Sequence, residues 1–159
     1  KLHQAFVNIS IGCNTLFVQQ SGGEKSVEFF KRNFQEIDLQ SALSIFNKVK
    51  TPDCSFEQFL EHVKKFSFVP ESVESWKEKL LQRRMIAGLR IHGAMMGIYA
   101  ERLGICIYHD ARTKELTEEM KIPRINLNKL DLDYLLDSLL EQLLFSPDEF
   151  CSELFSVDV

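Results

Sequence analysis

The stretch that decides the predicted fold spans residues 70–104 and reads PESVESWKEKLLQRRMIAGLRIHGAMMGIYAERLG. At 100° per residue, its apolar side chains fall on two faces of a helix. One face holds Val73, Trp76, Leu80, Ala87, Ile91, Ala94 and Ile98, and the other holds Leu81, Met85, Leu89, His92, Met96, Tyr99 and Leu103. Pro70 suits a first helical turn, and Gly104 suits the left-handed residue that follows a helix. The stretch therefore predicts one long helix at about 71–103, enclosed by neighbouring helices because it is apolar on two sides.

Shorter segments with apolar side chains every three or four residues flank this stretch. They predict helices at 2–19, 24–35, 39–49, 56–66, 114–120, 129–145 and 148–155. A strand is the alternative for the first segment, because its apolar residues also alternate, and Ile105–Tyr108 reads as a short strand or a buried extended connection. Ser55 followed by Gln58 has the spacing of a capping box. The predicted fold class is all-α, a single-domain bundle of about six to eight helices over residues 1–159. Because the chain does not begin with Met, it is also compatible with a fragment of a larger protein.

Composition limits the function classes. An apolar fraction of 45% in 159 residues supports a packed core, and a net charge of -4 argues against general attraction to nucleic acid or anionic lipid. No uninterrupted apolar run of about 18 residues is present, so we expect no transmembrane segment. The four cysteines, Cys13, Cys54, Cys106 and Cys151, are far apart and lie among apolar residues. This favours free thiols and an intracellular protein, cytoplasmic or nuclear. The alternative is a secreted protein with two disulfides, for which the Asn8-Ile9-Ser10 glycosylation sequon is the other indication.

Catalytic motifs are missing from the sequence. It contains no HExxH, GxSxG, Walker A or GxGxxG pattern. His92 falls on an apolar face and is expected to be a core histidine, and the adjacent His109 and Asp110 are not expected to face each other. Gly88, Gly93 and Gly97 are expected to allow another helix to approach closely, or to mark a kink in the long helix. The sequence therefore predicts a protein that is not an enzyme and needs no cofactor or metal.

The predicted function is non-enzymatic protein–protein interaction, as an adaptor or scaffold. On the long helix, Lys79, Arg83 and Arg90 would project along one strip between the two apolar faces, and Phe29 and Tyr134 are candidate aromatic anchors. Another protein would bind an apolar groove or helix face with charged flanks. The alternatives are a secreted helical cytokine-like ligand and a nucleic-acid-binding helical domain. Nucleic acid is disfavoured because no aromatic side chains are interleaved with the basic strip. The sequence predicts no oligomeric state.

A central helix rich in small residues and wrapped by amphipathic helices resembles the Bcl-2-like layout. The Asn-Trp-Gly-Arg signature of that family is absent from the sequence. The resemblance therefore implies an architecture and no function.

Overall fold

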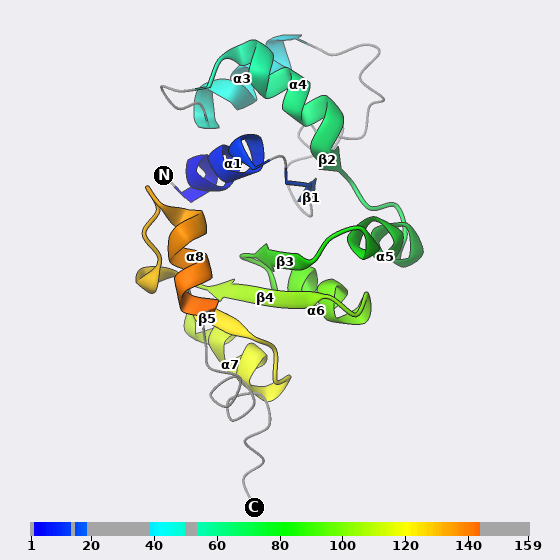
Figure 1. The fold of residues 1–159 in the computed structure, drawn as a ribbon, viewed down its shortest axis with the longest axis vertical. Coiled ribbons are helices and arrows are strands. Elements are labelled where there is room, and N and C mark those ends of the chain that lie inside the picture. The colour runs from blue at the N-terminus through cyan, green and yellow to red at the C-terminus, as the bar shows by residue number, and fades with distance from the viewer. Residues whose placement is uncertain (1, 14, 19–38, 50–53, 144–159) are drawn as a thin grey trace, which may run out of the picture. The chain divides into compact units, whose positions relative to one another are not determined.

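A computed structural model shows how the chain folds and describes residues 2–13, 15–18, 39–49 and 54–143 (Figure 1). The chain divides into two compact units, Lys1–Glu71 and Ser72–Val159. The expectation that they make up a single domain stays a prediction. The candidate ligand site described below lies in the second unit.

The first unit packs three described helices around an aromatic core. Its elements are α1 (Leu2–Gly12), β1 (Phe17–Val18), α3 (Leu39–Val49), α4 (Phe56–Phe66) and β2 (Ser67–Phe68). The buried core holds Ala42, Phe46, Phe59 and Val63, and the Phe46 ring lies 5.5 Å from that of Phe59. The capping box predicted at α4 is confirmed, because the Ser55 and Gln58 side chains exchange hydrogen bonds with each other's backbone N–H groups. The two short strands, β1 and β2, pair in parallel.

The second unit alternates helices with the strands of a parallel sheet. Its elements are α5 (Val73–Leu81), β3 (Met85–Gly88), α6 (Ile91–Tyr99), β4 (Leu103–Tyr108), α7 (Ala111–Glu119), β5 (Arg124–Asn126), the 3-10 turn η1 (Leu127–Lys129) and α8 (Leu135–Leu143). The strand order is β3-β4-β5, and both pairings are parallel. Each connection between neighbouring strands is a helix, as parallel pairing requires. Helix α6 packs against β3 and β4, and α7 packs against β4 (Figure 1).

This sheet overturns the predicted all-α class, and the chain is a mixed α/β protein. The predicted helix at 71–103 is wrong, because its residues form α5, β3 and α6 in succession. A four-residue apolar run such as Met85–Gly88 fits a buried strand as well as a helix. Treating this strand and the two helices beside it as one helix produced the two apolar faces seen in the sequence. Without that central helix, the resemblance to the Bcl-2-like layout also fails. The extended alternative at Ile105–Tyr108 is confirmed as part of β4.

Two glycines allow α6 to pack closely on β4. Gly104 was expected to follow a helix, but it lies inside β4, directly beneath α6. A Cβ placed there would collide with the backbone oxygen of Ala94 and lie 3.0 Å from its carbonyl carbon. On the helix side, a Cβ at Gly97 would lie 3.0 Å from the Gly104 Cα. Helix and strand therefore meet backbone to backbone, and the element that approaches Gly97 closely is a strand, where the sequence predicted another helix.

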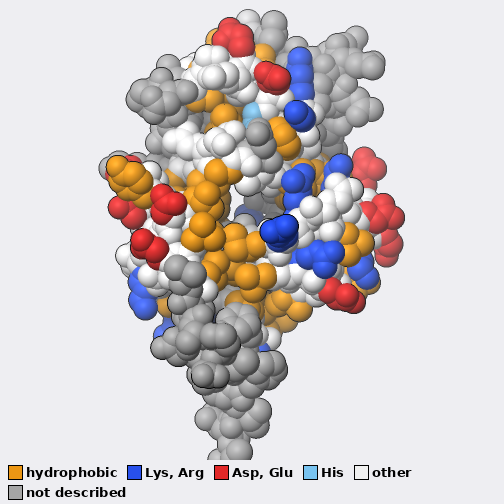
Figure 2. Space-filling model, viewed as in Figure 1, with side chains coloured by type: hydrophobic (Ala, Val, Ile, Leu, Met, Phe, Trp, Pro, Cys, Tyr) orange, Lys and Arg blue, Asp and Glu red, His pale blue; other side chains and the backbone are white. Residues whose placement is uncertain are grey.

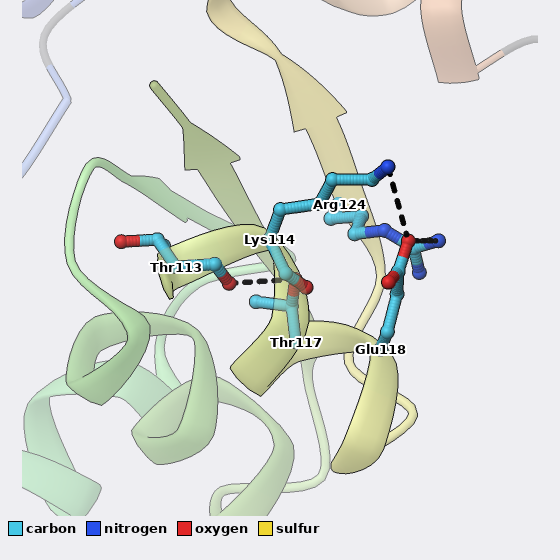
Figure 3. Close-up of polar contacts among 5 residues, drawn as sticks. All are labelled: Thr113, Lys114, Thr117, Glu118 and Arg124. Carbon is cyan, nitrogen blue, oxygen red and sulfur yellow. Dashed lines mark hydrogen bonds and ion pairs between the residues drawn. The ribbon is translucent and has the colours of Figure 1, made fainter. Parts of the chain in front are cut away.

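Helix α7 is held to β5 through its last turns. The Glu118 carboxylate binds the Arg124 guanidinium at 2.9 Å and the Lys114 ammonium at 3.8 Å (Figure 3). Thr117 is fully buried, and its hydroxyl donates to the backbone oxygens of Thr113 and Lys114 within the same helix. These contacts position the start of β5 beside β4.

The other predicted helices have mixed outcomes. The helix at 39–49 is confirmed as α3 and the helix at 56–66 as α4. The first predicted helix ends at Gly12 rather than at residue 19, and the helix predicted to start at residue 129 is α8, which starts at Leu135. The predictions at 24–35 and 148–155 lie outside the described residues.

Candidate functional site

Parallel pairing places the carboxyl ends of β3, β4 and β5 along one edge of the sheet. Gly88 is in register with Cys106, and Tyr108 is in register with Asn126. The residues that follow each strand are therefore neighbours across a spacing of about 4.8 Å per strand. In open α/β sheets, ligands bind outside this edge. We define the carboxyl edge as Arg90, His109, Asp110 and Asn126, together with the first turn of α6.

The start of α6 is the positive part of this edge. Arg90 is its N-cap, with an extended backbone, and makes no side-chain capping bond. The first N–H groups of a helix have no acceptor within the helix, and the helix dipole adds partial positive charge there. Arg90 is exposed at this helix start. An anion at this position would meet both a full charge and oriented backbone donors.

The start of α7, unlike that of α6, is capped by a side chain of the protein. Asp110 is the N-cap, and its Oδ1 accepts a hydrogen bond from the Thr113 backbone N–H at 2.7 Å. The backbone and side chain of Thr113 lower the pKa of this carboxyl below its usual value, and His109 and Arg112 add smaller effects in the same direction. The helix terminus is thus already neutralised by a carboxylate of the chain itself. An added anion is therefore favoured at α6 and disfavoured at α7.

His109 and Asp110 lie closer together than the sequence suggested. The Nε2 atom of His109 is 3.4 Å from Oδ2 of Asp110, and both side chains are about half exposed. The expectation that adjacent residues would not face each other is wrong here, because the chain is extended at the cap of α7. The geometry gives the edge an imidazole whose proton can be shared with a carboxylate. Asp110 three residues before Thr113 is an ordinary N-cap spacing, a signal that was available in the sequence.

The predicted contact residues do not form one strip. Lys79 is exposed on α5, Arg83 is half-buried in the α5–β3 connection, and Arg90 follows β3. All four residues of β3, roughly 13 Å of strand, lie between Arg83 and Arg90 together with Arg84 and Leu89. Tyr134 is 68% exposed immediately before α8, and Phe29 lies outside the described residues. Only Arg90 belongs to the carboxyl edge.

Basic side chains nevertheless gather on this unit. The space-filling view shows Lys and Arg side chains over α5, β3 and α6 (Figure 2). Some of these basic side chains make contacts within the unit. The Arg102 guanidinium donates hydrogen bonds to the backbone oxygens of Glu101 and Leu81, both at 2.9 Å. The Lys77 ammonium lies 4.6 Å from the centre of the Tyr99 ring. The basic side chains of this unit therefore do not form the single strip of Lys79, Arg83 and Arg90 that the sequence suggested, and Arg102 and Lys77 each have their own contacts.

Other kinds of site receive no support from the described residues. Among them, no group of three or more His, Cys, Asp or Glu side chains could hold a metal ion. No helix in the same part of the chain is long and apolar enough to cross a membrane. Cys13, Cys54 and Cys106 are free thiols, and burial together with the Asp110 charge raises the pKa of Cys106 to about 11.

Comparison with protein-family models, curated proteins and solved structures gives no match.

Proposed function

We propose that the second unit binds a small anionic ligand, one carrying a phosphate or carboxylate group, at the carboxyl edge of its sheet. The observation that carries the proposal is the start of α6, where the exposed Arg90 is the N-cap, makes no side-chain cap, and follows the end of a parallel strand. His109 and Asp110 would face the remainder of the ligand, because they follow the neighbouring strand. A hydroxyl or amine on the ligand would be the natural partner for the Asp110 carboxylate.

Inorganic phosphate is the simplest probe of this proposal. In a titration followed by amide NMR, we expect the largest shifts at Ile91 and His92, whose N–H groups lie in the first turn of α6. Arg90→Gln should raise the phosphate dissociation constant about tenfold, because one exposed charge-assisted hydrogen bond is lost. Asp110→Asn keeps an oxygen for capping α7 but removes the nearby negative charge, so phosphate should bind more tightly.

The matched control is Arg84→Gln. Arg84 is also exposed, but it precedes β3 and therefore lies at the opposite end of that strand. Its replacement changes the net charge by the same amount as Arg90→Gln while leaving the carboxyl edge intact. Equal weakening by both variants, or shifts spread over the whole unit, would mean that phosphate responds to net charge only and that the edge is not a site.

A second proposal is the non-enzymatic protein-interaction role that the sequence suggested. Its support is the exposure of Leu81, Ile98 and Tyr99, which lie at the ends of α5 and α6. The Arg102 contact to the Leu81 backbone oxygen brings these helix ends together, so the three side chains make a local apolar surface. The assignments as a non-enzyme and as an intracellular protein stay predictions.

The interaction proposal is tested by affinity capture from cell extract. Ile98→Glu places a charge in the local apolar surface and should abolish capture of any partner that binds there. Leu116→Glu is the control, because Leu116 is a partly exposed apolar residue on α7, away from that surface. Partners retained equally by both variants would exclude this surface as their binding site.

A further inference from the structure

The sheet of the second unit has an open edge along β3. The strand order is β3-β4-β5, so β3 pairs with β4 on one side, and no strand of the described residues pairs with its second side. Successive residues of a strand direct their N–H and C=O groups to alternate sides. Half of the backbone groups of β3 therefore point to an edge where no described strand satisfies them.

β3 lacks the features by which edge strands usually avoid pairing with another chain. Such strands are protected by a charged side chain, a proline or a bulge within the strand. Met85–Gly88 contains neither a charge nor a proline, is half-buried throughout, and pairs with residues 103–106 without interruption. Charges appear only at its two ends, because Arg83 and Arg84 precede it and Arg90 follows it. The open edge is thus an apolar strand with basic residues at both ends.

The three arginines at the ends of β3 have no acidic partner in the described part of the chain. The side chains of Arg83, Arg84 and Arg90 make no hydrogen bond or ion pair with any described residue. Arg84 and Arg90 are exposed, whereas Nε of Arg83 is buried and has no acceptor. A buried donor without an acceptor is unfavourable, and a carboxylate beside it would form a charge-assisted hydrogen bond.

The opposite edge of the sheet, along β5, is not equivalent. β5 has only three residues, and its first residue, Arg124, already has an acidic partner. The Glu118 carboxylate lies 2.9 Å from the Arg124 guanidinium. The basic charge at β5 is therefore neutralised by the chain itself, and an acidic strand is favoured at β3.

A second copy of this chain does not suit the β3 edge. Antiparallel pairing of two β3 strands, with Met85 opposite Gly88, would place Arg83 of each copy opposite Arg90 of the other. Like charges that lie directly opposite each other destabilise a strand pair. A strand with carboxylates at both ends would instead meet opposite charge at each end, whichever way its chain runs.

We propose that the open edge of β3 binds an extended peptide segment of another protein, apolar at its centre and acidic at both ends, which adds to the sheet as a further strand. Backbone hydrogen bonds to β3 would provide affinity. The carboxylates would meet Arg83 and Arg84 at one end and Arg90 at the other. The proposal does not depend on the anion site at the carboxyl edge, because two of its three arginines lie at the other end of β3.

Fluorescence anisotropy of a labelled synthetic peptide, titrated with the full chain, tests the strand addition. The probe has two glutamates at each end of a centre of alternating valine and threonine. A second peptide has lysine in place of every glutamate, and a third has methyl groups on two successive central amide nitrogens, so that one N–H directed at β3 is removed. We expect saturable binding of the glutamate peptide, at least about tenfold weaker binding of the methylated one, and none of the lysine peptide.

These peptides leave the protein unchanged, so their result does not depend on the folding of a variant. Equal affinity of the methylated and unmethylated peptides would show that no strand is added. Binding of the lysine peptide, or no binding of the glutamate peptide, would also overturn the proposal.

A matched pair of variants locates the peptide on the protein. Arg84→Glu and Arg112→Glu change the net charge equally and at exposed positions, but Arg112 lies on α7, which joins β4 to β5. We expect Arg84→Glu to weaken the glutamate peptide about tenfold and Arg112→Glu by less than about twofold. Equal weakening would mean that the peptide responds to net charge only, and the proposal would fail.

Amide hydrogen exchange on the wild-type chain gives an independent readout. With saturating glutamate peptide, we expect protection to rise within Met85–Gly88 and to stay unchanged within Arg124–Asn126. Protection that rises at β5 and not at β3 would place the peptide at the other edge and contradict the proposal.

Discussion

Replacement of Gly104 by Ala is the most demanding test of the second unit. The new methyl group would collide with the Ala94 backbone oxygen and lie 3.0 Å from its carbonyl carbon and 3.2 Å from its Cα. The collision with the oxygen is the closest of the three contacts, so α6 would have to retreat from β4 by about 1 Å or more to restore ordinary contact distances. No rotamer change can relieve this collision, because the opposing atoms are backbone. We therefore expect a loss of about 3 kcal/mol, the upper part of the range for overpacked cores.

The single tryptophan of the chain makes this loss measurable. Trp76 lies in α5 and so reports unfolding of the second unit only. For a unit of this size, each kcal/mol corresponds to about 4–8 °C, so the fluorescence midpoint of Gly104→Ala should fall by about 12–24 °C. Gly88→Ala is the control: a Cβ at Gly88 meets nothing within 4 Å, and its backbone does not have positive φ. That variant should be neutral or slightly stabilising. A fall of less than about 4 °C for Gly104→Ala would contradict the backbone contact between α6 and β4.

Three further predictions concern a turn, a thiol and an ion pair of the second unit. Glu101 has a φ of 57° between α6 and β4, so Glu101→Gly should raise stability by about 0.5–1 kcal/mol in the same fluorescence assay, and a decrease would argue against the left-handed backbone. Because the pKa of Cys106 is raised to about 11, a short pulse of iodoacetamide at pH 8 should label the exposed Cys13 but leave Cys106 unmodified in mass spectra; equal labelling would show that Cys106 is accessible. A double-mutant cycle on Glu118 and Arg124 should give a coupling of about 0.5–1 kcal/mol that weakens in high salt, and a coupling insensitive to salt would exclude an ion pair.

Local signals in the sequence predicted local structure well. Ser55 and Gln58 identified the start of α4, and apolar side chains at helical spacing identified α3 and α4 themselves. Each of these features depends on residues within a few positions of one another. The residues of a single cap or a few helical turns are therefore enough to recognise these features in the sequence.

The sheet could not be recognised in this way. Met85–Gly88 has the same apolar character as the helices on either side, and its partner strand begins eighteen positions further along, at Leu103. Its place in the sheet comes from pairing with β4 and from packing under α6, where a Cβ at Gly97 would lie 3.2 Å from the Ile86 Cβ. Periodicity within one segment contains no information about such pairing.

The candidate site was missed for the same reason. Arg90 was singled out, but as part of a strip with Lys79 and Arg83 that existed only on the predicted long helix. Its place after a strand that neighbours the one before His109 and Asp110 follows from strand order and register, which the sequence alone does not provide. What the sequence did contain was the cap spacing of Asp110 and the apolar run before it, which together indicate a strand followed by a helix.

The contact of α6 with β4 limits how this unit can respond to a ligand. Gly97 meets Gly104 backbone to backbone, and Ile91 and Ala94 of α6 pack with Cys106 of β4, so the helix cannot slide along the strand without breaking these contacts. The β3–α6–β4 block should therefore move as a rigid body. Any hinge at the carboxyl edge would have to lie in the connections after β4 and β5, so a bound anion would be held on a fixed platform and enclosed, if at all, from the side of His109.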